Sequence, residues 1–232
     1  MRLVAALAAL ALAGCEAADS IAADNQVEAE ARDLAVLTSL PIFFSPEFSV
    51  EPVDSPLRRT LEEEWRLDLL PTSETEVLDG HELALLLHPP VQTAEALVDL
   101  DEWVRGGGRV LLLADPLYES ETGLALGDPR APPLFFMDTG LLAHWGVTLH
   151  GPEEIGNNRL GVTGRGRLEV EGEACEAADE PSTGLDGFIV HCRLGEGHAL
   201  IIADADFLNR DPRHGYPGNG LLLAQLERLA AF

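Results

Sequence analysis

Two short apolar runs, Leu83 to Leu87 and Val110 to Ala114, stand out along the chain because no polar residue alternates with the apolar ones. Such runs are typical of strands that are buried on both faces of a parallel sheet. Between them, apolar residues recur every three or four positions from Ala94 to Arg105, which predicts an amphipathic helix. Thr93 is a suitable cap for its start, and Gly106 to Gly108 ends it. The pattern predicts a strand–helix–strand unit with a right-handed crossover.

The same kind of pattern extends over the rest of the chain and predicts an α/β fold with a mostly parallel sheet. Further strands are expected at Leu34 to Leu40, Leu67 to Leu70, Val147 to Leu149 and His198 to Ala203. Further helices are expected from Leu57 to Trp65 with Ser55 as cap, from Asp138 or Thr139 to Gly146, and after Asn219 as cap. Residues 153–167 are polar and Gly-rich, and a β-ribbon insertion is expected near residues 165–195.

The N-terminus has the pattern of a processing segment. Residues 1–14 contain one basic residue and a short apolar run, and Leu12-Ala13-Gly14-Cys15 resembles the lipobox of bacterial lipoproteins. That resemblance implies that Cys15 carries the lipid and that the protein faces the periplasm. The absence of Asp at residue 16 favours the outer membrane. An ordinary secretory signal with an incidental cysteine is the alternative. Residues 15–33 are expected to be a flexible tether, and residues 34–232 the folded domain.

The chain is strongly acidic, with 15 basic and 40 acidic residues and a formal net charge of −25. This charge argues against a nucleic-acid partner. All the basic residues except histidine are arginine, so a P-loop lysine and a Schiff-base lysine are excluded. A solubilising surface is the simplest interpretation of the acidity.

Export would place Cys175 and Cys192 in an oxidising compartment, and each is near an expected strand. A disulfide between them is therefore one interpretation. A metal site made by two isolated cysteines is disfavoured.

Polar residues follow three of the expected strands. His88 follows the first run, Asp115 the second, and Asp204, Asp206 and Asn209 follow the strand that ends at Ala203. The carboxyl ends of parallel strands are where ligands bind in open α/β sheets, so these five residues form a possible ligand-binding edge. Carboxylates there can hold a divalent cation. They can equally cap turns and helices.

Other known site patterns are missing from the sequence. No G-x-S-x-G elbow exists, and no G-x-G-x-x-G follows a strand. The remaining histidines are scattered without ligand spacing. Loop aromatic and apolar residues would form a protein-contact patch if exposed together, or close the core if buried; they are Phe43, Phe44, Phe48, Leu134, Phe135 and Phe136. The long 116–133 segment also favours a binding role.

The order of several segments resembles the GldG-type auxiliary proteins of ABC transport systems, with their GldG/IFT52-like domains. The segments are Leu83 to Pro89, Leu97 to Pro116, Gly127 to Arg130, Leu141 to Val147 and Gly197 to Asn209. The resemblance covers about residues 34–232 and implies a flavodoxin-like three-layer sandwich, related in shape to class I glutamine amidotransferases. Those enzymes place a cysteine nucleophile at a sharp strand-to-helix turn, where this chain has His88-Pro89-Pro90. Family members often carry membrane-spanning helices, whereas this chain has the lipobox-like start.

Together these patterns predict a lipid-anchored, non-enzymatic envelope protein that needs no cofactor and binds an ABC transporter or another envelope protein. The alternative is a metal-dependent hydrolase that uses His88, Asp115, Asp204 and Asp206. A third interpretation is a domain with a packing role alone. Hydrolysis requires the acids to converge at the floor of a pocket, whereas binding leaves them dispersed or engaged as caps.

Overall fold

The computed structural model describes residues 32–43, 55–119, 124, 128, 131–154, 158, 160–161, 164–181, 183–210 and 212–232. These residues belong to one compact unit, Ala31–Phe232. The expected signal segment, Cys15 and the expected tether up to residue 31 lie outside the described residues. Phe44, Phe48 and most of residues 120–130 lie outside them too.

The elements follow one another in this order: β1 (Arg32–Thr38), α1 (Pro56–Glu64), β2 (Trp65–Leu69), α2 (Thr75–Leu78), β3 (Leu83–Leu87), α3 (Ala94–Arg105), β4 (Arg109–Leu113), α4 (Leu141–Trp145), β5 (Val147–Glu154), β6 (Gly164–Val170), β7 (Cys175–Ala177), β8 (Ile189–Leu194), β9 (Gly197–Ile202), η1 (Pro212–His214) and α5 (Pro217–Ala230). The expected bounds of β3 and α3 are confirmed without change. β2 and β4 each begin earlier than expected.

A seven-stranded sheet, in the order β2-β1-β3-β4-β9-β8-β7, forms the centre of the fold. The strands from β2 to β9 in that order are parallel, and β8 and β7 add an antiparallel edge. β5 and β6 form a separate antiparallel pair. The mixed, mostly parallel α/β sandwich that the sequence predicts is therefore confirmed.

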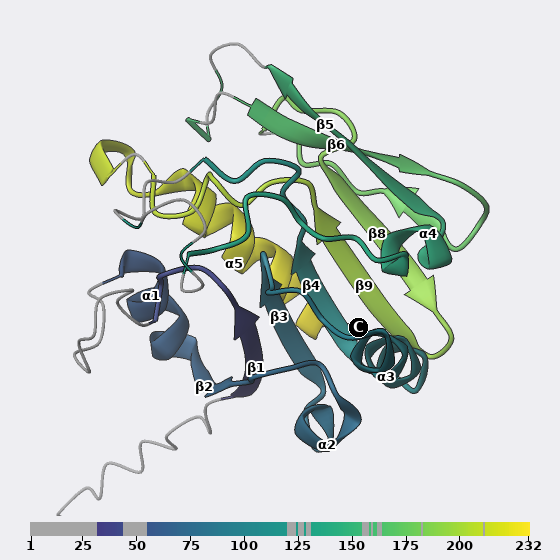
Figure 1. Cartoon of the computed structure of the whole chain (residues 1–232). Coiled ribbons are helices and arrows are strands. Elements are labelled where there is room, and N and C mark those ends of the chain that lie inside the picture. The colour runs from purple at the N-terminus through teal and green to yellow at the C-terminus, as the bar shows by residue number, and fades with distance from the viewer. Residues whose placement is uncertain are drawn as a thin grey trace, which may run out of the picture. The chain divides into compact units, whose positions relative to one another are not determined.

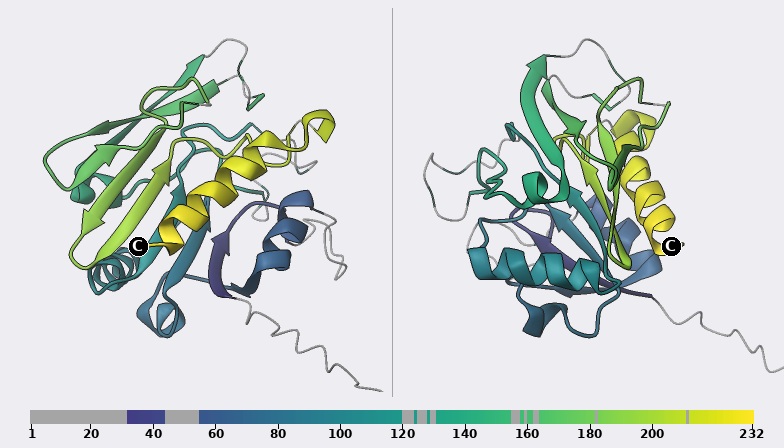
Figure 2. Two further views of the ribbon diagram at one scale, coloured as in Figure 1. Left: turned by 180° about the vertical axis from the view of Figure 1, so that it is seen from behind. Right: turned by 90° about the vertical axis from the view of Figure 1, so that its right-hand side faces the viewer.

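Helices cover both faces of this sheet and give it three layers (Figures 1 and 2). Leu57 and Leu61 of α1 and Leu222 and Leu226 of α5 pack in the core on one face. On the other face, the second core includes buried residues of α2, α3, α4 and the β5–β6 pair. The strands contribute alternate residues to the two cores, since successive side chains of a strand point to opposite faces.

The helix caps follow from local chemistry. The Ser55 hydroxyl accepts a hydrogen bond from the Arg58 amide, and Thr93 does the same for Ala96. After α3, the left-handed residue is Gly107, with φ of +113°. The expected cap of α5 is wrong: the helix begins at Pro217, because proline is tolerated in the first turn, and Asn219 lies inside it.

The β-ribbon expected near residues 165–195 is divided between two pairings. β6 pairs with β5, and β5 extends to Glu154, into the polar and Gly-rich residues 153–167. Polar residues tolerate this pairing because one side of the ribbon faces solvent. β7 instead pairs with β8 and extends the main sheet. Among the described residues, none of the helices has the length and apolar character needed to span a membrane.

Candidate functional site

The parallel strands β3, β4 and β9 are neighbours, so their carboxyl ends meet at one edge of the sheet. This arrangement brings together His88 after β3, Asp115 after β4, and Asp204 and Asp206 after β9. His88, Asp115 and Asp204 are almost fully buried. The expected gathering at the strand ends is therefore present, but most of it lies beneath the surface.

His88 is a buried structural link. Its Nε2 lies 2.8 Å from the carbonyl oxygen of Pro133, and because a carbonyl only accepts, Nε2 carries the proton. The other ring nitrogen, Nδ1, has no partner among the described residues. Burial lowers the pKa of His88. The hydrogen bond to the Pro133 carbonyl and the charge of the Asp115 carboxylate raise this pKa, but burial has the larger effect. The ring stacks on Tyr118 with centroids 5.3 Å apart.

The backbone of His88 is unusual. Its φ is +41°, in the left-handed region that residues other than glycine seldom adopt. The turn after β3 is therefore sharp. The side chain at this turn is an imidazole with no solvent exposure. A buried ring with one nitrogen bonded to a carbonyl is poorly placed to attack a substrate.

Asp115 and Asp204 hold backbone turns. The Leu117 and Ala205 amides donate to the two oxygens of Asp115 at 2.8 and 2.9 Å, and the Phe207 amide donates to Asp204 at 3.2 Å. Burial raises the pKa of Asp115. Burial first, and then the charges of Asp115 and Asp206, raise the pKa of Asp204 well above its usual range. These acids therefore act as caps.

Asp206 joins the β9 end to the segment after β4. Both of its oxygens accept from the Glu119 amide, at 3.1 and 3.0 Å. The Arg210 guanidinium lies 3.8 Å from Oδ1, which is too far for a direct hydrogen bond. Burial, followed by the charge of Asp115, raises the pKa of Asp206 to about 6.

Asn209 holds two helices together. Its Oδ1 accepts from the Leu57 amide at 2.9 Å and from Asn219 at 3.1 Å, and its Nδ2 donates to Ser55 at 3.1 Å. Asn209 adopts φ of +56°, which asparagine tolerates well. Its polar atoms are thus used to fasten α1 to α5, and we assign it a structural role.

A cleft of about 600 Å³ opens at this edge. One part of its wall is apolar, from Leu40, Ile42 and Leu208, and another is charged, from Glu119, Asp206 and Arg210. The sequence did not indicate Glu119 or Arg210. Their signal was weak, since Glu119 and Arg210 lie six and eight residues past the ends of β4 and β9, where a charged residue is usually a solvated loop residue.

A metal centre is not apparent at this edge. In the described part of the chain, no three or more His, Cys, Asp or Glu residues are grouped so that they could hold an ion. Two separate backbone amides engage both oxygens of Asp115, and a third engages Asp204, where a cation would need those oxygens.

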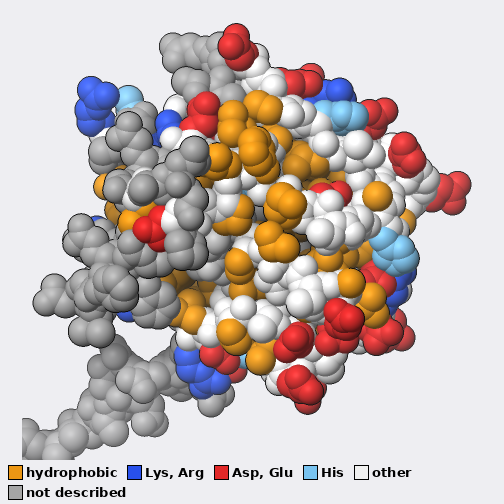
Figure 3. Space-filling model, viewed as in Figure 1, with side chains coloured by type: hydrophobic (Ala, Val, Ile, Leu, Met, Phe, Trp, Pro, Cys, Tyr) orange, Lys and Arg blue, Asp and Glu red, His pale blue; other side chains and the backbone are white. Residues whose placement is uncertain are grey.

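The segment that leads into α4 exposes apolar side chains beside the cleft. Leu134, Phe135 and Met137 are each about half exposed, at 45%, 51% and 52%. The Tyr118 amide donates to the Leu134 carbonyl at 2.8 Å, which fixes this segment against the cleft wall. Figure 3 shows hydrophobic side chains gathered across the middle of this face. We name Leu134, Phe135 and Met137 the apolar strip.

Other expected patch residues lie elsewhere. Phe43 is buried in the first core, and Phe136 is partly buried against the second. The aromatic residues of the described loops therefore divide between core and surface.

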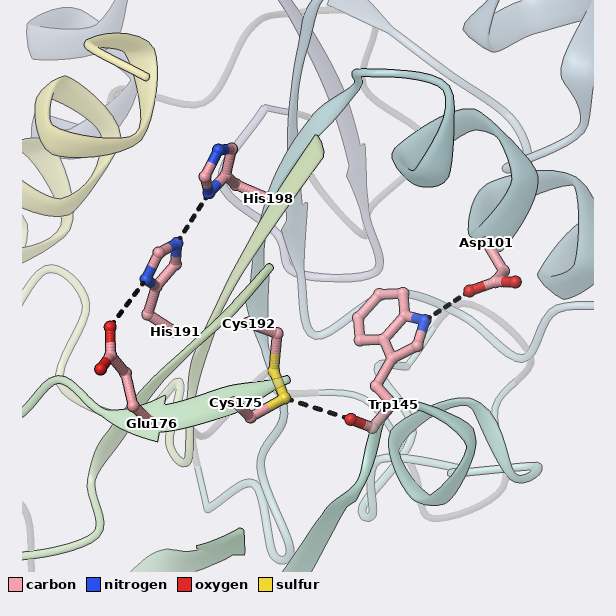
Figure 4. Close-up of a disulfide and its surroundings, with 7 residues drawn as sticks. All are labelled: Asp101, Trp145, Cys175, Glu176, His191, Cys192 and His198. Atoms are coloured by element: carbon pink, nitrogen blue, oxygen red, sulfur yellow. Dashed lines mark hydrogen bonds and ion pairs between the residues drawn. A yellow bond between two sulfur atoms is a disulfide. The ribbon is translucent and has the colours of Figure 1, made fainter. Parts of the chain in front are cut away.

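Away from the cleft, a disulfide joins Cys175 of β7 to Cys192 of β8 (Figure 4). Beside it, His191 of β8 lies with its Nε2 2.9 Å from Nδ1 of His198 on β9, and its Nδ1 lies 3.7 Å from Glu176 of β7 (Figure 4). The spacing of the histidines in the sequence did not indicate this pair. The signal was available, because His191 and His198 flank the short turn between the antiparallel strands β8 and β9.

Comparisons with known proteins address the fold. No family model matches this chain, and no curated protein matches it. Among solved structures, the N-terminal domain of IFT52 (mmIFT52) superimposes with a TM-score of 0.50 and 13% identity, covering 82% of this chain and 94% of that chain. The exo-β-1,4-mannosidase Op5Man5 from Opitutaceae bacterium strain TAV5 gives 0.48 and 12%, covering 84% of this chain and 35% of that chain. The cytoplasmic protein STM1381 from Salmonella typhimurium LT2 gives 0.44 and 12%, covering 74% and 87%. At such identities, the likeness to the IFT52 domain shows the fold alone.

Proposed function

We propose that this chain is a lipid-anchored, non-enzymatic binding component of the cell envelope that serves an ABC-type transport system. The observation that carries the proposal is the use of the strand-end acids. They hold the loops around a cleft by accepting backbone amides, as Asp115 and Asp206 do, and so keep a rigid rim for a partner or ligand. The GldG-type resemblance of the sequence supplies the transport context.

The apolar strip gives this rim a contact surface. Phe135 and Met137 each expose about half of their surface area to solvent. The chain that carries them has a formal net charge of −25. An apolar contact on a strongly acidic chain favours a partner with an apolar patch and a basic rim, because opposite charges steer association. The exposed strip is therefore a partner surface that would be used from the periplasmic side.

A metal-dependent hydrolase is the second candidate. Burial, followed by the charges of neighbouring acids, raises the pKa of Asp204 and of Asp206, and a raised pKa is a common property of catalytic acids. We consider it weaker, because backbone amides already engage both oxygens of Asp115 and one oxygen of Asp204. Melting temperature measured with and without Mg²⁺, Mn²⁺ or Zn²⁺ tests it: a metal-induced rise that Asp115→Asn abolishes would favour hydrolysis.

Co-purification tests the binding role. The tagged protein is extracted from native membranes in mild detergent, and its partners are identified by mass spectrometry. An ABC-type permease or ATPase is expected with the wild type and with the control pair Val91→Ser and Val98→Ser, whose side chains are also more than half exposed. The pair Phe135→Ser and Met137→Ser should lose it. Retention of the same partner by both pairs, or no transporter component with any of them, contradicts the proposal.

The anchor has its own test. Cys15→Ala should move the protein from the membrane fraction to the soluble periplasmic fraction, with the fold unchanged. A variant that stays in the membrane fraction contradicts lipid attachment at Cys15.

A further inference from the structure

The charged wall of the cleft has an arrangement that suits one chemical class of ligand. Asp206 and Arg210 carry opposite charges, and their nearest atoms are 3.8 Å apart without a direct hydrogen bond. Each group therefore keeps bonding capacity toward the cleft. Two opposite charges side by side complement a ligand whose own two charges are adjacent and reversed.

The remaining acceptor capacity of Asp206 can be counted. Its two oxygens share the Glu119 amide, and each carboxylate oxygen has two lone pairs, so acceptor sites remain. The groups that face it are Asp115, Asp204, Glu119 and Arg210. Three of these four are acids, so an added ammonium group at Asp206 relieves repulsion.

The other wall of the cleft is apolar. Leu40 and Ile42 come from the segment after β1, and Leu208 from the segment after β9. A volume of about 600 Å³ lies in the range of small-molecule sites. The cleft thus combines a positive group, a negative group and an apolar surface. A zwitterion, unlike a free anion, is also not repelled by a chain of net charge −25.

We propose that the cleft binds a free α-amino acid with an apolar side chain, its ammonium group on Asp206, its carboxylate on Arg210, and its side chain against Leu40, Ile42 and Leu208. The inference rests on the proposed binding role and names the ligand class of that same site. It does not depend on the apolar strip, which serves a protein partner.

Isothermal titration of the purified full-length protein with leucine and two analogues tests the assignment. Leucinamide removes the carboxylate, and N-acetyl-leucine removes the ammonium group. Each loses a charge-assisted hydrogen bond, so its Kd should be about tenfold or more higher than that of leucine. Equal affinity for all three ligands, or no binding of leucine, overturns the proposal. This comparison uses the wild-type protein, so it does not depend on a variant folding.

Variants then identify the groups. Asp206→Asn should weaken leucine binding about tenfold but leave the weak affinity for N-acetyl-leucine unchanged, because that analogue lacks the ammonium group. Arg210→Gln should also weaken leucine binding about tenfold but leave the weak affinity for leucinamide unchanged, because leucinamide lacks the carboxylate. Asp79→Asn and Arg213→Gln make the same changes at exposed positions away from the cleft and should leave all affinities unchanged. Lowering the pH from 7.5 to 5 should also weaken leucine binding, because Asp206 becomes neutral. Loss of affinity in the control variants, or none in Asp206→Asn, contradicts the assignment.

The outcomes separate this inference from the proposed function. If leucine does not bind but the transporter component still co-purifies through the apolar strip, the ligand assignment alone fails. If leucine binds as described and no transporter component co-purifies, the transport role alone fails.

Discussion

The Nε2–H of His88 donates a 2.8 Å hydrogen bond to the carbonyl oxygen of Pro133, which lies 45 residues later in the chain. This bond ties the end of β3 to the segment that carries the apolar strip. With the Phe136 amide bonded to the Asp115 carbonyl at 2.8 Å, it holds that segment against the sheet edge. The residue at the sharp turn after β3 thus positions a loop.

His88→Ala should therefore destabilise the domain by about 2–4 kcal/mol, because it opens a cavity and leaves the Pro133 carbonyl unbonded. Urea unfolding measures this cost. His150→Ala is the control: His150 is partly exposed and paired with Glu169, so its loss should cost less than about 1 kcal/mol. Similar stability of His88→Ala and the wild type would show that the bond has no structural role.

Asp206 should make stability depend on pH between 5 and 7.5. Its pKa in the folded state, about 6, lies above the unfolded value of 3.8, so the folded state binds the proton more tightly. The contribution of Asp206 to the free energy of unfolding is fully present below pH 4 and is lost as the pH rises through 6. About 1 kcal/mol should disappear between pH 5 and pH 7.5.

The measurement is the free energy of unfolding at both pH values. Asp206→Asn cannot ionise and should show a correspondingly smaller loss, whereas Asp79→Asn should behave as the wild type does. An unchanged pH dependence in Asp206→Asn would mean that other groups cause it.

The disulfide should stabilise the fold by lowering the conformational entropy of the unfolded chain. Cys175 and Cys192 are 17 residues apart, and closing a loop of that size is worth about 3 kcal/mol in the chain-entropy estimate. Replacing both cysteines by serine should lower the melting temperature by about 6–12 °C in a domain of this size. Cys15→Ser, which removes a cysteine that has no place in this loop, should leave it unchanged. A double variant that melts with the wild type contradicts a stabilising disulfide.

Two glycines of α5 should respond in opposite ways to alanine. A Cβ at Gly218 would lie 2.3 Å from the carbonyl oxygen of Phe207, next to the cleft, whereas nothing lies within 4 Å at Gly220. Gly218→Ala should cost about 1–3 kcal/mol through crowding. Gly220→Ala should gain about 0.5–1 kcal/mol from helix propensity. Thermal unfolding distinguishes the two, and equal effects would mean that α5 does not approach Phe207 closely.

Local pattern was enough to predict the central unit of the fold. Strand β3 and helix α3 have the expected bounds, because a continuous apolar run and an amphipathic stripe each depend only on a few neighbouring residues. The placement of His88, Asp115 and Asp206 at one edge also follows from strand ends in a parallel sheet.

The roles of those residues were not predictable in the same way. Pro133 bonds to His88, and the Glu119 amide bonds to Asp206, across long sequence separations. The hydrophobic periodicity of the sequence carries no information on such contacts. The partners of β5 and β7 were missed for a related reason. Polar strands of a ribbon have a weak alternation signal, so their register depends on packing against the rest of the fold.

Site-specific photo-crosslinking in intact cells shows whether this edge of the domain is a binding surface of a transport system. A photoreactive residue is placed at Phe135, in the apolar strip, and as a control at Val98, which is exposed to a similar degree on α3. We expect an adduct with an ABC-type permease or ATPase from position 135 and none from position 98. No adduct at position 135, or the same adduct from both positions, would contradict it.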